Sequence, residues 1–192
     1  MNHRKNKEMT TSSMLGFTVV EMLVVLSVMA IITGVVLAKY RGYGTNALFA
    51  NATENIVLSI RQAQLYGVAV KGTTGTCSVG SQFDCSFGVN FSVATPDRLT
   101  IFADNNNNGI FDAGDGTTQV VLWKSPIAVT AATCDGSACN GGIVNFTFKR
   151  PSPSAMIHDS GATTYNAGSV SVSDGIKTSI VTVNKAGQIS LQ

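Results

Sequence analysis

Residues 14–37 read MLGFTVVEMLVVLSVMAIITGVVL, and the rest of the chain is arranged around this stretch. Sixteen of the 21 residues from Phe17 to Leu37 are apolar. A helix of that length, at ~1.5 Å per residue, is long enough to cross a ~30 Å hydrocarbon layer. Glu21 is the charged residue of the run. Because a carboxylate inside a membrane costs about 3 kcal/mol, we expect Glu21 to have a neutralising partner and a function.

A basic segment comes before this run and carries Arg4, Lys5 and Lys7. A basic flank followed by an apolar run is typical of an export signal and holds the N-terminus in the cytoplasm. An ordinary secretory signal has its cleavage site after the apolar run, whereas the small residue Gly16 precedes it. Cleavage after Gly16 would keep the helix and create an ammonium group on Phe17, one helical turn from Glu21.

The segment Gly16-Phe17-Thr18-Val19-Val20-Glu21 resembles the signature of type IV prepilins and type II secretion pseudopilins. The resemblance implies that prepilin peptidase cuts after Gly16 and methylates the amine of Phe17. It also implies that Glu21 pairs with the amine of a neighbouring subunit, and that other pilin or pseudopilin subunits and an inner-membrane assembly platform are partners. Residues 60–64 (IRQAQ) are similar to the end of the first helix in GspH/FimT-type minor pseudopilins. The alternative is a plain single-pass anchor.

Hydrophobic periodicity divides the remainder of the chain. Lys39 and Arg41 mark a membrane interface, and glycines at 42 and 44 are positions where a helix loosens. Apolar residues then recur at steps of three and four, at Leu48, Ala52, Ile56, Ile60, Ala63 and Gly67. We predict a cleaved leader at 1–16, a transmembrane or filament-core helix at 17–38, the outer half of that helix at 39–72, and a β-rich exported domain at 73–192.

From Cys77 onward the apolar period changes to two, which indicates β-strands. The candidate strands are 87–93, 99–103, 119–123, 143–148, 169–173, 179–183 and 188–191. Short, closely spaced strands without helices between them favour antiparallel pairing. The expected fold class is therefore α+β: a pilin-like long N-terminal helix packed on an antiparallel sheet or small sandwich.

Charge and motifs limit the function classes. The net charge is +2, and removal of Arg4, Lys5, Lys7 and Glu8 leaves ten basic and ten acidic residues, which disfavours nucleic-acid binding by bulk charge. The resemblance leaves a DNA-binding FimT-like minor pilin as an alternative, but Gly187-Gln188-Ile189-Ser190 lacks both arginines of that group's Gly-Arg-x-Arg motif. We expect Lys149 and Arg150 to be a solvated pair and His158 a surface residue. The sequence has no P-loop or dinucleotide motif, and we predict no enzyme.

Four cysteines follow the membrane run: Cys77, Cys85, Cys134 and Cys139. An exported domain lies in an oxidising compartment, where an even number of cysteines favours disulfides. Proximity favours Cys77 with Cys85 and Cys134 with Cys139, and crossed pairing, free thiols and a zinc site are the alternatives. The spacings within the pairs are wider than those of usual zinc sites.

Residues 104–115 read DNNNNGIFDAGD and fit the spacing of a calcium loop. The expected ligands are Asp104, Asn106, Asn108, the carbonyl of Ile110, Asp112 and Asp115. The twelfth residue is Asp in place of the usual Glu, and strands flank the loop in place of helices. The alternative is a polar hairpin tip without metal, because Asn and Gly are common turn residues.

Two functional classes remain. The first is a structural pilin or pseudopilin subunit, anchored in the inner membrane with a cytoplasmic N-terminus and a periplasmic C-terminal domain, and then assembled into a filament. The second is a binding role as a DNA-uptake subunit or as a major, adhesive pilin. The GspH/FimT resemblance favours a minor subunit, and the sequence does not distinguish pilus, secretion and competence machines.

Overall fold

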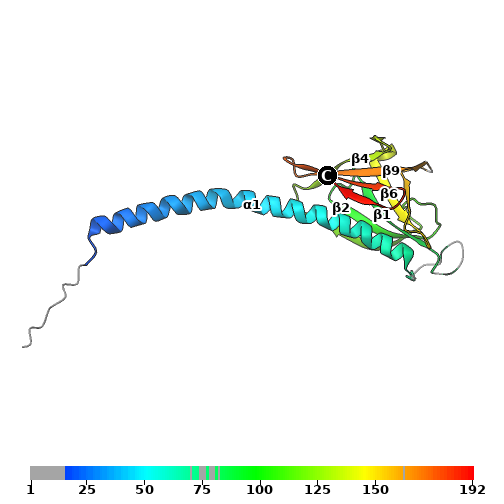
Figure 1. The fold of residues 1–192 in the computed structure, drawn as a ribbon, viewed down its shortest axis with the longest axis horizontal. Coiled ribbons are helices and arrows are strands. Elements are labelled where there is room, and N and C mark those ends of the chain that lie inside the picture. The colour runs from blue at the N-terminus through cyan, green and yellow to red at the C-terminus, as the bar shows by residue number, and fades with distance from the viewer. Residues whose placement is uncertain (1–15, 70, 74–76, 78–80, 82, 162) are drawn as a thin grey trace, which may run out of the picture. The chain divides into compact units, whose positions relative to one another are not determined.

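The computed structural model describes residues 16–69, 71–73, 77, 81, 83–161 and 163–192 (Figure 1). Except for Gly16, the predicted leader therefore lies outside the described residues. The chain divides into two compact units, Met1–Gly44 and Thr45–Gln192.

One helix, α1 (Val19–Val68), is shared by the two units. Helical structure continues through Gly42 and Gly44, the positions where the sequence indicated that the helix could loosen. In the first unit, Val19–Ala38 has a mean hydropathy of 2.6 and none of it is buried, so its length and composition are sufficient for one membrane crossing. This agrees with the membrane-spanning helix expected from residues 17–38.

The described residues of the second unit form eleven strands, and every pair of these strands is antiparallel. The six-stranded sheet, which we call sheet A, has the order β3-β2-β1-β6-β7-β8. The five-stranded sheet, sheet B, has the order β11-β10-β9-β4-β5. The strands are β1 (Ser86–Ser92), β2 (Arg98–Asp104), β3 (Gly116–Leu122), β4 (Ala128–Cys134), β5 (Ser137–Ala138), β6 (Ile143–Phe148), β7 (Ala155–His158), β8 (Thr164–Tyr165), β9 (Ala167–Ser173), β10 (Thr178–Asn184) and β11 (Ile189–Leu191).

A single hydrophobic core joins the outer part of α1 to both sheets within the second unit. From α1 it takes the fully buried Ile56, Ile60 and Ala63, three positions of the stripe predicted from sequence. The sheets approach closely at Gly168 of β9, where an added Cβ would lie 2.8 Å from the ring of Phe146 in β6. The fold is therefore α+β, with an N-terminal helix and two packed antiparallel sheets.

Four strands were not predicted from sequence: β4, β5, β7 and β8. The predicted strands lie close to β1, β2, β3, β6, β9, β10 and β11, and 143–148 coincides with β6. A short 3-10 turn, η1 (Asn140–Gly142), connects β5 to β6.

Candidate functional site

The predicted cleavage junction lies in an exposed, non-helical segment directly before α1. Phe17 is 77% exposed. A Cβ added at Gly16 would meet no heavy atom within 4 Å. The peptide bond between the two residues is therefore sterically accessible, as cleavage at this point would require.

Glu21 lies in the first turn of α1, which begins with a side-chain cap. The backbone N–H of Glu21 donates a hydrogen bond of 3.2 Å to Thr18 Oγ1. Thr-x-x-Glu is the sequence of a capping box, and a carboxylate in the first turn interacts favourably with the helix dipole. The ion pairs of the described residues are Arg98–Asp97 and Arg150–Asp84, so within this part of the chain Glu21 has no cationic partner.

The candidate calcium loop is built around Asp104, which is fully buried at the end of β2. Its Oδ2 accepts hydrogen bonds from the Gly109 N–H at 2.8 Å and from Ser86 Oγ at 2.9 Å, and its Oδ1 accepts one from the Asn108 N–H at 3.1 Å. Gly109 has a φ of +81°. The loop therefore wraps its backbone amides around the first predicted ligand.

The middle of the loop converges on Asp112. Its Oδ2 accepts hydrogen bonds from Asn106 Nδ2 at 2.8 Å and from Asn108 Nδ2 at 3.0 Å. The side-chain oxygens of the two asparagines accept the N–H groups of Asn108 and Ile110. In this arrangement the asparagines present N–H groups to the loop centre, so bound calcium would require these amides to turn their oxygens inward.

Asp115, the twelfth position, closes the loop by accepting the N–H groups of Asn105 and Asp112, each at 2.9 Å. Burial raises the pKa of Asp115, and the charges of Asp104 and Asp112 act in the same direction. Among the described residues no group of three or more His, Cys, Asp or Glu side chains is placed to hold a metal ion. Calcium binding thus stays a prediction, and the same donors and acceptors also close the loop without metal.

The loop is more than a hairpin tip, because it folds back over the face of sheet A that is opposite the core. The Phe111 ring packs on Phe102 with centroids 5.1 Å apart, and the Phe111 N–H donates to Asn145 Oδ1 at 3.3 Å. Asn90 Nδ2 donates to the same oxygen at 2.7 Å. Residues 104–115 therefore cover part of the sheet and are attached to β1, β2 and β6.

The expectation that His158 is a surface residue was wrong. His158 is 8% exposed at the end of β7, and a Cβ added at Gly109 would lie 2.4 Å from its Nδ1. Its Nε2 is hydrogen-bonded to Thr164 Oγ1 at 3.1 Å, while Nδ1 has no partner among the described residues. Burial lowers the pKa of His158, and the nearby Asp104 and Asp159 partly oppose that shift. The loop therefore rests on a buried histidine.

Both disulfides join the pairs favoured by proximity. Cys77 is bonded to Cys85 and Cys134 to Cys139, with Cα atoms 5.3 and 5.1 Å apart. The second bond links the end of β4 to the residue after β5. All four cysteines are buried.

Arg150 also differs from the predicted solvated pair. Its Nη2 forms an ion pair of 3.0 Å with Asp84 Oδ1, and the same group hydrogen-bonds to the Phe83 carbonyl. The side chain is 27% exposed. Arg150 therefore attaches the segment before β1 to the turn after β6, and this engagement limits its use for phosphate.

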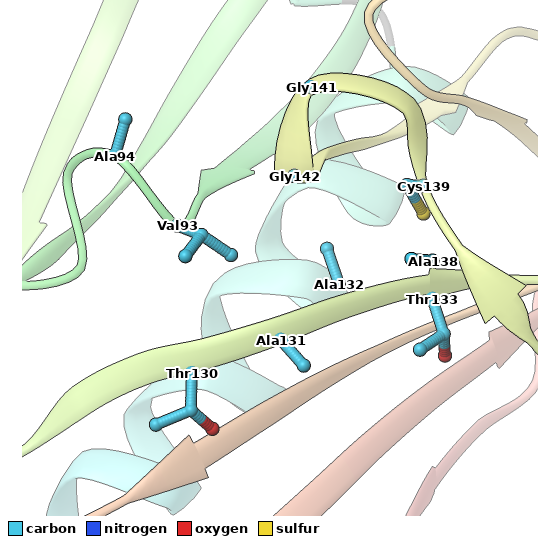
Figure 2. Close-up of a pocket in the computed structure, with 10 residues that line it drawn as sticks. All are labelled: Val93, Ala94, Thr130, Ala131, Ala132, Thr133, Ala138, Cys139, Gly141 and Gly142. Atoms are coloured by element: carbon cyan, nitrogen blue, oxygen red, sulfur yellow. The ribbon is translucent and has the colours of Figure 1, made fainter.

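A groove that the sequence did not indicate lies beside β4 (Figure 2). It has a volume of about 450 Å³, and small or uncharged residues line it: Val93, Ala94, Thr130, Ala131, Ala132, Thr133, Ala138, Cys139, Gly141 and Gly142. Large apolar residues do not alternate along β4, so hydrophobic periodicity did not predict this strand. A second groove, of about 360 Å³, lies between α1 and β11 and includes Leu58 and Leu191 in its lining.

The comparisons of this chain with protein-family models, with curated proteins and with solved structures returned no match.

Proposed function

We propose that this chain is a minor pilin or pseudopilin subunit of a type IV pilus or a type II secretion filament. The observation that carries the proposal is the junction at Gly16 and Phe17, which is accessible and is followed by a capped helix with Glu21 in its first turn. The apolar segment Val19–Ala38, none of which is buried, follows directly. The accessible junction resembles a substrate of prepilin peptidase, and the apolar helix resembles the segment that packs in the core of a helical filament.

In this proposal, prepilin peptidase cuts after Gly16 and methylates Phe17 at the inner membrane. The helix anchors the subunit with its N-terminus in the cytoplasm and the β-rich unit in the periplasm. The disulfides Cys77–Cys85 and Cys134–Cys139 suit an oxidising compartment of this kind. Assembly on the inner-membrane platform then transfers the helix from lipid to the apolar core of the filament.

The pairing of Glu21 with the Phe17 amine of a neighbouring subunit supplies the missing counter-charge. In an apolar environment two opposite charges attract strongly, and an unpaired one is costly. The ion pairs of the described, uncut residues do not include Glu21, so its counter-charge comes from an amine that cleavage creates, and in the filament this is the amine of a neighbour.

Cleavage is tested by coexpressing the full chain with a prepilin peptidase and determining the N-terminus by mass spectrometry. We expect a methylated Phe17 in the wild-type chain and uncut protein in Gly16→Leu. Gly34→Ala is the matched control, since a Cβ there also meets nothing within 4 Å but lies inside the helix. An uncut wild-type chain, or normal cutting of Gly16→Leu, would contradict the proposal.

Assembly is tested with Glu21→Gln, because glutamine at this position keeps the capping box and removes the charge. We expect this variant to be cleaved and inserted but lost from sheared filaments. Thr18→Ala is the control, as it removes the cap and keeps the carboxylate. Filament incorporation of Glu21→Gln at the wild-type level would refute the role of the charge.

A DNA-uptake subunit is the competing function. The ion pair of Arg150 with Asp84 argues against it, because a paired guanidinium is less available to phosphate. A mobility shift at low salt that weakens steeply as salt is added would favour DNA binding instead.

A further inference from the structure

The chain contains the dipeptide Asn-Gly twice, at 108–109 and at 140–141. In this dipeptide the glycine nitrogen can attack the asparagine side chain, because no Cβ on the following residue shields it. The two copies have the same reacting groups, so a difference in their reactivity that disappears on unfolding comes from the fold.

In the first copy, three hydrogen bonds hold the reacting groups, namely the Gly109 N–H and the Asn108 side-chain amide. The Gly109 N–H donates at 2.8 Å to buried Asp104, so the attacking nitrogen is engaged. Asn108 Oδ1 accepts the Ile110 N–H at 2.8 Å, and Asn108 Nδ2 donates to Asp112 at 3.0 Å. Both the nucleophile and the electrophile are therefore fixed.

The second copy has neither restraint. Asn140 and Gly141 are exposed in the turn η1. Within the described residues, the structure gives the Asn140 side chain and the Gly141 N–H no hydrogen-bond partner. The hydrogen bonds of this turn come from other groups, namely the N–H groups of Gly142 and Ile143.

The fold also requires glycine at position 141. Gly141 has a φ of +69°, a region that side-chain-bearing residues rarely adopt, and an added Cβ would lie 3.1 Å from Ser160 Oγ. Figure 2 places Gly141 at the rim of the groove beside β4. The turn thus keeps an exposed Asn-Gly pair at the edge of this groove.

We infer that Asn140 is a site of spontaneous deamidation and that Asn108 is protected from the same reaction. Base removes the Gly141 amide proton, the nitrogen forms a bond to Asn140 Cγ, and the Cγ–Nδ2 bond breaks with release of ammonia. Water then opens the succinimide to aspartate or isoaspartate, and no oxidant or reductant is required.

The product changes the charge of the turn. The backbone of Asn140 lies near enough to the carboxyl group of Asp159 to contribute to lowering its pKa, so a new carboxylate at position 140 would lie close to an existing one. The isoaspartate form would also add a methylene to the backbone at the rim of the groove. The modification therefore introduces negative charge and altered geometry at one defined edge of the domain.

The test uses the full chain in detergent, incubated at mildly alkaline pH, then reduced and digested with trypsin. Cleavage after Arg98, Lys124 and Lys149 separates the two dipeptides into different peptides. Fragment-ion mass spectra then assign the deamidated residue. We expect deamidation at Asn140 to be at least about tenfold faster than at Asn108, because a charged hydrogen bond must open first at Asn108.

The chain unfolded in urea with reductant provides the control, and there the two sites should react at similar rates. The variant Asp104→Ala provides a second control. This substitution frees the Gly109 N–H and should accelerate deamidation at Asn108 alone. Equal rates in the folded chain, or no reaction at Asn140, would overturn the inference. A tenfold difference that persists in urea would also overturn it, because sequence and not structure would then be the cause.

Discussion

The attachment of residues 104–115 to sheet A predicts an unequal effect of removing two carboxylates from that loop. Asp104→Ala leaves the buried Gly109 N–H without its acceptor, whereas the Asn108 N–H keeps Asn106 Oδ1 and Ser86 Oγ keeps Asn107 Oδ1. A buried donor without a partner costs about 1–3 kcal/mol, so with one such donor and two weakened contacts we expect a loss of about 2–3 kcal/mol of unfolding free energy. Asp112→Ala frees donors that reach water, and its cost should stay below about 1 kcal/mol.

The assay is thermal and urea unfolding of the Thr45–Gln192 unit, which holds the whole hydrophobic core, in buffer with a chelator. For a domain of this size about 2–3 kcal/mol lowers the Tm by roughly 8 °C, against ~3 °C or less for Asp112→Ala. Because metal is absent, calcium cannot produce the difference. Equal destabilisation by the two variants, or less than about 1 kcal/mol for Asp104→Ala, would refute the reasoning.

Three further predictions concern the same unit. If the loop binds calcium, millimolar calcium should raise the Tm in wild type and much less in Asp115→Asn, and a Tm unaffected by calcium and chelator would contradict the metal site. Because burial lowers the pKa of His158, the unfolded chain binds its proton more readily, so stability should fall as pH drops below about 6.5. His158→Gln should weaken that dependence in Tm measurements between pH 7.5 and 5.5. Replacing Cys134 and Cys139 together by serine opens a short loop and should cost about 2 kcal/mol in urea unfolding.

The sequence predicted the elements whose side chains alternate or recur strongly. Ile56, Ile60 and Ala63 form one helical stripe, and β6 shows Val144, Phe146 and Phe148 at every second position. The missed strand β4 reads AVTAATC, in which small residues give no contrast between the two faces. Its burial depends on a partner sheet that local sequence does not reveal.

The wrong prediction for His158 has the same cause, because its burial depends on residues that are distant in sequence. Its neighbourhood is rich in proline and serine, which indicated a surface loop. The residue is buried because Gly109, far away in sequence, brings the 104–115 loop over it. Local patterns predicted the loop's turn residues and acceptors, but its attachment to Asn145 and Phe102 is a tertiary property.

The properties of α1 are consistent with a helix that exchanges one apolar environment for another. Val19–Ala38 has a mean hydropathy of 2.6 although it contains Glu21, and a helix this apolar is stable when lipid or other helices surround it. Burial in lipid and burial among neighbouring helices remove similar apolar area from water, so hydrophobicity alone does not select between them. Thr18 Oγ1 can accept the hydrogen bond from the Glu21 N–H in both environments, because both groups belong to the same chain. Under the proposed function, the carboxylate of Glu21 is therefore the group whose energy differs, and its pairing with a neighbour's amine biases the exchange toward the filament.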